Sequence, residues 1–330
     1  MDIPLFVIVI IAVALIFDFL NGFHDAANSI ATIVVTRALT PFQAVLLAAF
    51  ANFIGAFIFG VAIANTIGKG VLDNTFVTLS LIFAALMGAI IWNIITWYFG
   101  LPTSSSHALI GGLVGAGIAS VGMKAILAKG LLKILVFIII APLLGMIAAM
   151  IFTVIIIWVF HKIKRAKANK SFRWMQLISA SAYSISHGTN DAQKTMGIIA
   201  LTLLTAGVTA KFQVSMWIIL SCHAAIALGT FFGGWRIVKT MGTSITKIRP
   251  MEGFCAETSS AVVLMGTAHA GIPVSTTHVI SGSIMGVGTI ENARNVRWTT
   301  ARKIMWAWVL TIPISAVIAA GCYFVVKMFV

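Results

Sequence analysis

Long runs of apolar residues dominate this chain and limit the folds open to it. The clearest runs occupy residues 3–20, 42–67, 76–99, 131–160, 212–234 and 304–330. A helix of about 20 apolar residues is long enough to cross the hydrocarbon core of a bilayer. Only 9% of the residues are charged, whereas soluble domains contain about 25%. We therefore expect an all-α integral membrane protein that has the lipid bilayer as its solvent.

The net charge of +14 does not indicate nucleic-acid binding. The lysines and arginines lie in short segments between the apolar runs, and these segments contain few aromatic residues that could stack on bases. Basic residues in such positions are typical of the cytoplasmic side of a membrane. Placing most of them inside predicts about ten crossings, with both termini outside and segment 161–173 in the cytoplasm. The expected location is the cell membrane.

Two sequence motifs occur twice, in the same order. Residues 21–29 read NGFHDAANS and residues 187–195 read HGTNDAQKT, at an offset of 166. Residues 102–117 read PTSSSHALIGGLVGAG and residues 273–288 read PVSTTHVISGSIMGVG, at an offset of 171. Duplication of this kind indicates two structural repeats.

The duplication also predicts how the chain is organised. Residues 1–160 form the first repeat, residues 161–173 a basic linker, and residues 174–330 the second repeat. An odd number of crossings in the first half makes the second half enter from the opposite face. Inverted-topology repeats, with broken helices or re-entrant hairpins at the midplane, are typical of alternating-access transporters. A channel or a membrane enzyme has no comparable need for this symmetry.

The two proline-containing motifs predict helix N-termini that bind an anion. Pro102 and Pro273 suit the first turn of a helix, and the hydroxyl groups that follow can cap that turn or contact a ligand. Free backbone N–H groups and the positive end of the helix dipole favour an oxyanion. In a single copy, hydroxyls bonded to their own backbone would be the simpler interpretation, but two copies favour binding. The candidate residues are Ser104, Ser105, Ser106, Ser275, Thr276 and Thr277.

Two aspartates of the repeated motifs are expected inside the membrane. A carboxylate there is costly, so Asp25 and Asp191 are candidate sites for an ion or a proton, a role compatible with capping a broken helix. Neighbouring amide and hydroxyl oxygens are ligands that hard cations prefer. These oxygens belong to Asn21, Asn28, Ser29, Asn190 and Thr195.

Three further charged residues are expected to be embedded. Lys194 could contact the bound anion and offset its charge, neutralise Asp191, or extend its ammonium group toward the membrane surface. Glu257 is expected to take part in ion coupling. For Asp18 the sequence favours no particular role.

Three histidines accompany these motifs. His24, His107 and His278 could carry protons, because histidine titrates near physiological pH, or they could be hydrogen-bonded structural residues. Their spacing fits no zinc site, and a serine next to His107 in sequence is not a catalytic triad. We therefore expect neither an enzyme, nor a structural metal site, nor a cofactor.

Four segments together resemble the inorganic phosphate transporter (Pit) family. They are GFHDAANSIAT (22–32), PTSSSH (102–107), SHGTNDAQKTMG (186–197) and PVSTTH (273–278). The resemblance implies low-affinity phosphate symport by a homodimer. It assigns the aspartate motifs to the cation, through Asp25, Asn28, Asn190 and Asp191. It assigns the hydroxyl motifs to phosphate, through Ser104, Ser105, Ser106, Ser275, Thr276 and Thr277.

One position departs from the pattern of the sodium-coupled members, which read Gly-Ala-Asn-Asp where this chain reads Gly-Phe-His-Asp. His24 replaces an amide ligand by a titratable ring and resembles the proton-coupled prokaryotic members, which carry phosphate or a neutral metal–phosphate complex. We therefore expect H⁺ as the coupling cation, with Na⁺ as the second possibility. The sequence is also compatible with a permease for sulfate or another oxyanion, with an anion channel, and with a phosphate sensor.

Overall fold

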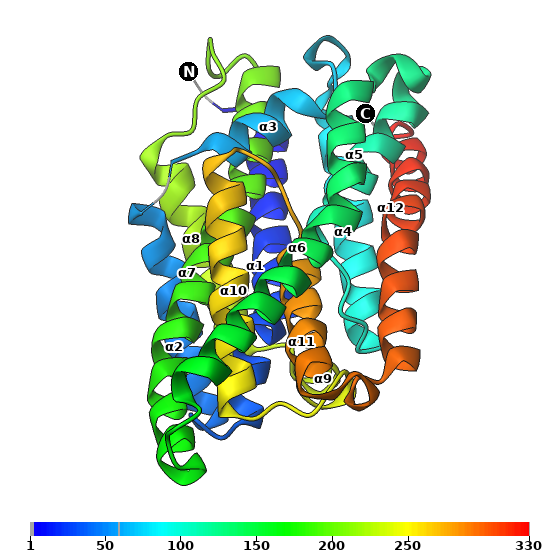
Figure 1. The fold of residues 1–330 in the computed structure, drawn as a ribbon. Helices are drawn as coiled ribbons and strands as arrows, with labels where there is room; N and C mark the ends of the chain where they lie inside the picture. Colours follow the sequence, from blue (N-terminus) through cyan, green and yellow to red (C-terminus); the bar gives the residue numbers. More distant parts are fainter. Residues whose placement is uncertain (1–2, 59, 330) are drawn as a thin grey trace.

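The computed structural model describes residues 3–58 and 60–329, and these residues form helices joined by short connections (Figure 1). The helices are α1 Leu5–Val35, α2 Pro41–Ile54, α3 Ala62–Gly70, α4 Leu79–Tyr98, α5 Ser105–Val121, α6 Ala128–Phe160, α7 Arg165–Thr205, α8 Met216–Phe232, α9 Trp235–Lys239, α10 Pro250–His269, α11 Thr276–Asn292 and α12 Trp298–Val326. No β-strand occurs in the described ranges, so the all-α expectation is confirmed.

Helices α1 to α6 and helices α7 to α12 follow the same order. Each half has a long helix, a pair separated by a short break, a single helix, a helix that follows a proline-containing motif, and a long helix with an internal proline. The internal prolines, Pro142 in α6 and Pro313 in α12, are separated by the same offset as the proline-containing motifs. Helix α7 begins at Arg165, so most of segment 161–173 is helical.

Several helices are long and apolar enough to cross a membrane. Among the described residues these are α1, α4, α5 with the turn after it, α6 and α12, which makes 5 spans, or up to 7 if the bent pairs α2–α3 and α8–α9 each count as one. The polar motifs lower the mean hydropathy of the remaining long helices, such as α7. The expected number of about ten crossings stays a prediction.

The basic segments gather at one end of the bundle. Arg37, Lys170 and Arg173 line one groove there, and the short helix α9 with Arg236 and Lys239 lies at the same lower end of the view (Figure 1). The start of α1 and the end of α12 lie at the opposite end (Figure 1). Charge is thus distributed unevenly along the axis of the bundle, as the positions of the basic loops in the sequence lead us to expect.

Helices α1 and α7 continue through Asp25 and Asp191 without a break. The aspartates therefore do not cap broken helices. The motifs contain no proline, and side chains from other helices hydrogen-bond the polar groups, so the backbone has no reason to unwind.

Helices α5 and α11 begin in the interior of the protein. Rings from their first turns, His107 and His278, have centroids 4.7 Å apart, and α5 lies toward one end of the molecule while α11 lies toward the other (Figure 1). Pro102 and Pro273 precede the helices, which start at residues 105 and 276. The expectation that these prolines occupy the first helical turn is wrong, because the serine two residues further on caps each helix.

Glycines allow these two helices to pack closely on the long helices. A Cβ atom at Gly115 of α5 would lie 2.0 Å from the carbonyl oxygen of Ala316 in α12. At the equivalent position, a Cβ atom at Gly286 of α11 would lie 2.5 Å from the carbonyl oxygen of Met146 in α6. The backbones can approach this closely only without side chains, and the contacts fix α5 and α11 against their neighbours.

Candidate functional site

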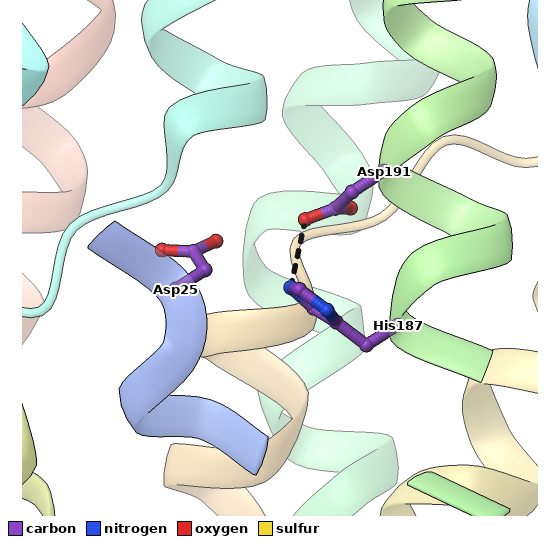
Figure 2. Close-up of side chains that lie close together, drawn as sticks. All are labelled: Asp25, His187 and Asp191. Carbon is purple, nitrogen blue, oxygen red and sulfur yellow. Dashed lines mark ion pairs between the residues drawn. The ribbon is translucent and has the colours of Figure 1, made fainter. Parts of the chain in front are cut away.

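The repeated motifs meet in the interior, where α1, α5, α7 and α11 come together. Asp25 of α1 is 2% exposed and Asp191 of α7 is fully buried. Figure 2 shows the carboxylate of Asp191 directed toward the ring of His187, with Asp25 across from both, and one ligand atom from each of the three residues lies within 4.8 Å of the others. His187 Nε2 is 3.3 Å from Asp191 Oδ2. Oxygen and nitrogen atoms in this arrangement could hold a cation.

Asp25 accepts hydrogen bonds from hydroxyl groups of both α5 and α11. Ser105 Oγ lies 3.2 Å and Thr277 Oγ1 3.3 Å from its Oδ2 atom. His24 Nδ1 lies 2.7 Å from the other carboxylate oxygen. The second ring nitrogen of His24 is 3.1 Å from Thr96 Oγ1 of α4. The carboxylate is therefore coupled directly to a titratable ring.

Asp191 is paired with the ammonium group of Lys194. Lys194 Nζ donates to Asp191 Oδ1 at 2.5 Å, to the backbone oxygen of Val274 at 3.1 Å, and to Ser106 Oγ. Thr276 Oγ1 donates to the other carboxylate oxygen at 3.2 Å. Lys194 is 1% exposed, so it does not extend toward the membrane surface. Among the described residues, the place where the repeated motifs meet thus has two carboxylates and one fixed cation.

The first serine of each proline-containing motif is used as a helix cap. Ser104 Oγ accepts a hydrogen bond from the backbone N–H of His107, and Ser275 Oγ accepts one from that of His278, both at 3.2 Å. The next two hydroxyl groups of each motif contact the carboxylates or the ammonium group of the site. They belong to Ser105, Ser106, Thr276 and Thr277. The positive ends of two helix dipoles therefore converge on the site.

The two asparagines predicted as cation ligands differ in position. Asn28 Nδ2 donates to Thr277 Oγ1 at 2.9 Å, and its Oδ1 atom has no hydrogen-bond partner among the described residues. Asn190 Nδ2 instead donates to the backbone oxygens of Ser186 and Leu264, and its Oδ1 atom likewise has no hydrogen-bond partner in the described part of the chain. Asn28 lies in the site, whereas these contacts direct Asn190 toward α10.

Glu257 of α10 lies in a separate polar cluster. Thr32 Oγ1 donates to Glu257 Oε1 at 2.6 Å, Gln176 Nε2 lies 3.2 Å from the same atom, and Ser179 Oγ donates to Oε2. Thr32 connects this cluster to α1. Asp18 is also fully buried, and within the described part of the chain its two carboxylate oxygens have no hydrogen-bond partner.

His107 and His278 face each other between the first turns of α5 and α11. The ring of His278 also stacks on Trp308 of α12, with centroids 4.0 Å apart. Trp308 Nε1 donates to the backbone oxygen of Pro102 at 3.0 Å. These contacts give His107 and His278 a packing role between the two halves.

Five residues that contribute to these contacts were not named from the sequence: Thr32, Thr96, Gln176, Ser179 and His187. The sequence did contain an indication for His187, because the offset of 166 aligns it with Asn21, which was predicted as a candidate cation ligand. Asn21 Oδ1 accepts a hydrogen bond from Ser105 at 2.5 Å. Thr96 and Gln176 lie outside the repeated motifs, and only the packing of α4 and α7 brings them in.

Comparison with known proteins gives consistent matches. The model of the phosphate transporter family matches residues 21–319. A protein of Rhizobium meliloti described as a "probable low-affinity inorganic phosphate transporter" is 55% identical and covers 96% of this chain and 95% of its own length. A protein of Bacillus subtilis with the same description is 46% identical over 99% of both chains. A solved structure described as "the sodium-dependent phosphate transporter" has a TM-score of 0.89 and 26% identity, over 99% of this chain and 100% of that one.

Proposed function

Because this chain belongs to the phosphate transporter family, we propose that it imports inorganic phosphate as a secondary symporter, together with a cation. The family membership confirms the resemblance in the four motifs and identifies a multi-pass membrane transporter of phosphate rather than an enzyme. The coupling, the site residues and the transport cycle are the proposed parts.

Phosphate binds, in this proposal, between the first turns of α5 and α11. Helix N-termini present backbone N–H groups without intrahelical partners, and two such termini meet here. Ser105, Ser106, Thr276 and Thr277 add hydroxyl donors that can rotate toward a tetrahedral anion. Neutral donors of this kind stabilise an anion without adding permanent positive charge.

The charge balance of the interior supports coupling to a cation, and this observation carries the proposal. Asp25 and Asp191 are buried beside the hydroxyls that would bind phosphate, and Lys194 offsets only one of them. Charges interact strongly where the dielectric constant is low, so an unaccompanied phosphate would be repelled by the uncompensated carboxylate. A cation bound at Asp25 removes that repulsion, and the two ions therefore bind together.

The proton is the cation that this arrangement favours. His24 contacts Asp25 directly, and a mostly apolar cavity of about 110 Å³ adjoins the ring, with Leu20, Phe23, Asn93, Ile94 and Trp97 as its other lining residues. A proton could reach the carboxylate through this ring. The competing candidate is Na⁺, because the similar solved structure is described as sodium-dependent.

The transport cycle follows from the duplicated order of elements. Two halves of the same construction, entering the membrane from opposite sides, can exchange their conformations and open the site to each face in turn. We place the protein in the cell membrane with both termini outside and the basic end in the cytoplasm, and we propose that it is a homodimer.

The experiment is uptake of labelled phosphate into proteoliposomes under an imposed proton gradient or an imposed sodium gradient. Wild type is compared with Asp25→Asn, and with Asp73→Asn as a matched control, because Asp73 lies in an exposed turn where it contacts Thr75. We expect proton-driven uptake that only Asp25→Asn abolishes. Uptake that needs sodium and ignores protons would refute proton coupling. Competition by excess unlabelled sulfate would refute the specificity for phosphate.

A further inference from the structure

Several aligned residues of the site differ between the two halves, and at one of these positions the formal charge of the side chain at neutral pH differs. The offset of 166 aligns Asp25 with Asp191 and Asn28 with Lys194. The first half therefore carries a neutral amide at the position where the second half carries a cation. The contacts of each side chain decide whether the two occupy equivalent places.

The aligned aspartates share one equivalent contact. Ser105 Oγ donates to Asp25 Oδ2 at 3.2 Å. Its counterpart at the offset of 171, Thr276, donates to Asp191 Oδ2 at the same distance of 3.2 Å. Each aspartate thus accepts a hydrogen bond from the second hydroxyl of the proline-containing motif in its own half.

The aligned amide and ammonium groups also share one equivalent contact, and it crosses between the halves. Asn28 Nδ2 donates to Thr277 Oγ1 of the second half at 2.9 Å. Lys194 Nζ donates to Ser106 Oγ of the first half, and Ser106 and Thr277 are aligned by the offset of 171. Lys194 therefore occupies the place in the second half that corresponds to Asn28 in the first.

The surroundings of the Lys194 ammonium group resemble those of a bound cation. An ammonium group has three N–H donors, and all three are used, by a carboxylate oxygen, a hydroxyl oxygen and a backbone carbonyl oxygen. Oxygen atoms of these three kinds are the ligands of hard metal cations. At the corresponding place in the first half, Asn28 Oδ1 has no partner in the described part of the chain and is available to an ion.

We propose that Lys194 is a tethered cation that permanently fills the cation position of the second half. Only the first half, at Asp25 and Asn28, then takes up a mobile cation, so one cation position is exchanged in each transport cycle. This inference rests on the proposed symport, and it changes the role expected for Lys194. Its three donors are committed to the protein, so its ammonium group balances Asp191 and does not contact phosphate.

The test compares wild type with Lys194→Asn, which gives the second half the residue found in the first. Phosphate uptake into proteoliposomes is measured in sodium chloride and in choline chloride at equal ionic strength. In choline we expect phosphate uptake by the variant to be about 100-fold slower than uptake by wild type, because a buried carboxylate without its counter-charge is strongly unfavourable. Uptake by the variant should depend on the sodium concentration, whereas proton-coupled uptake by wild type should not. Lys211→Asn, in an exposed connection, is the matched control and should behave as wild type.

A second measurement does not depend on phosphate. The melting temperature of each purified protein is compared in sodium chloride and in choline chloride. Sodium should raise the melting temperature of Lys194→Asn more than that of wild type, because only the variant offers the additional site. A variant whose uptake and melting temperature respond to sodium no more than wild type overturns the proposal.

If Lys194→Asn fails to fold in both media, the double variant Asp191→Asn/Lys194→Asn tests the proposed pairing of the two charges instead. It removes both charges together, so we expect it to fold in both media, because no buried carboxylate is left without its counter-charge. A double variant that also fails to fold would show that the ammonium group does not act as the counter-charge of Asp191 and would overturn the proposal. A wild-type protein that transports no phosphate would refute the proposed function alone, because the melting experiment still reports on the cation position.

Discussion

Gly115 lies where α5 crosses α12, and replacing it with alanine should move the two helices apart. A Cβ atom at this position would lie 2.0 Å from the carbonyl oxygen of Ala316 and 2.5 Å from its carbonyl carbon, whereas ordinary contacts begin at 3.4 Å. The neighbouring atoms belong to the backbone, so a rotamer change cannot relieve the overlap. The helices must therefore separate by about 1.4 Å to restore an ordinary contact.

The size of the effect follows from two opposing contributions. Overpacking costs about 1–3 kcal/mol, and alanine in place of glycine favours a helix by about 1 kcal/mol. The depth of the overlap places the cost toward the upper end, so we expect a net loss of about 1–2 kcal/mol for Gly115→Ala. Gly286→Ala should lose less, because its closest contact is 2.5 Å.

Thermal unfolding in detergent measures these differences, with Gly321→Ala as the control. A Cβ atom at Gly321 would have no neighbour within 4 Å among the described residues, so this variant should be at least as stable as wild type. At about 2–4 °C per kcal/mol, the melting temperature of Gly115→Ala should fall by roughly 2–8 °C. Phosphate uptake should fall with it, because α5 carries Ser105 and Ser106. A melting temperature for Gly115→Ala at or above that of Gly321→Ala would refute the packing argument.

Three further substitutions test individual contacts by the same unfolding assay. Ser275→Ala removes the cap of α11 and should cost about 1 kcal/mol. Thr32→Val removes the 2.6 Å hydrogen bond to buried Glu257 and should cost about 1–3 kcal/mol; a neutral result would contradict the polar cluster around that carboxylate. Glu291→Gln breaks an ion pair with Arg249, whose side chain is 52% exposed, so stability should change by less than about 1 kcal/mol.

The duplication identified most of the residues that the structure brings together at the candidate site, because their motifs occur twice. It could not predict the exchange of partners between the halves. The alignment relates Asn28 to Lys194, but only the folded structure shows that each contacts a hydroxyl of the opposite half. Such pairings depend on how α1 and α7 pack between α5 and α11, and a sequence motif contains no record of that packing.

The direction in which a side chain leaves its helix is the second feature that the sequence could not predict. Consecutive residues of a helix point about 100° apart, so His24 and Asp25 do not face the same point. The imidazole of His24 is long enough to reach the carboxylate at 2.7 Å. The shorter amide of Asn190 bonds instead to the carbonyl oxygens of Ser186 and Leu264. The aligned motifs predict equivalent roles for His24 and Asn190, but the difference in side-chain length gives the two residues different partners.

The hydrogen bond between Asn28 and Thr277 joins residues 249 positions apart, and this distance has a consequence for biosynthesis. Ribosomes add about 5–20 residues per second, so α11 emerges roughly 12–50 s after the polar motif of α1. During that interval α1 carries His24, Asp25 and Asn28 without the hydroxyl groups of α11. Unsatisfied polar groups are costly in lipid, so we expect α1 to be held at the insertion machinery, or inserted loosely, until the second half has been synthesised.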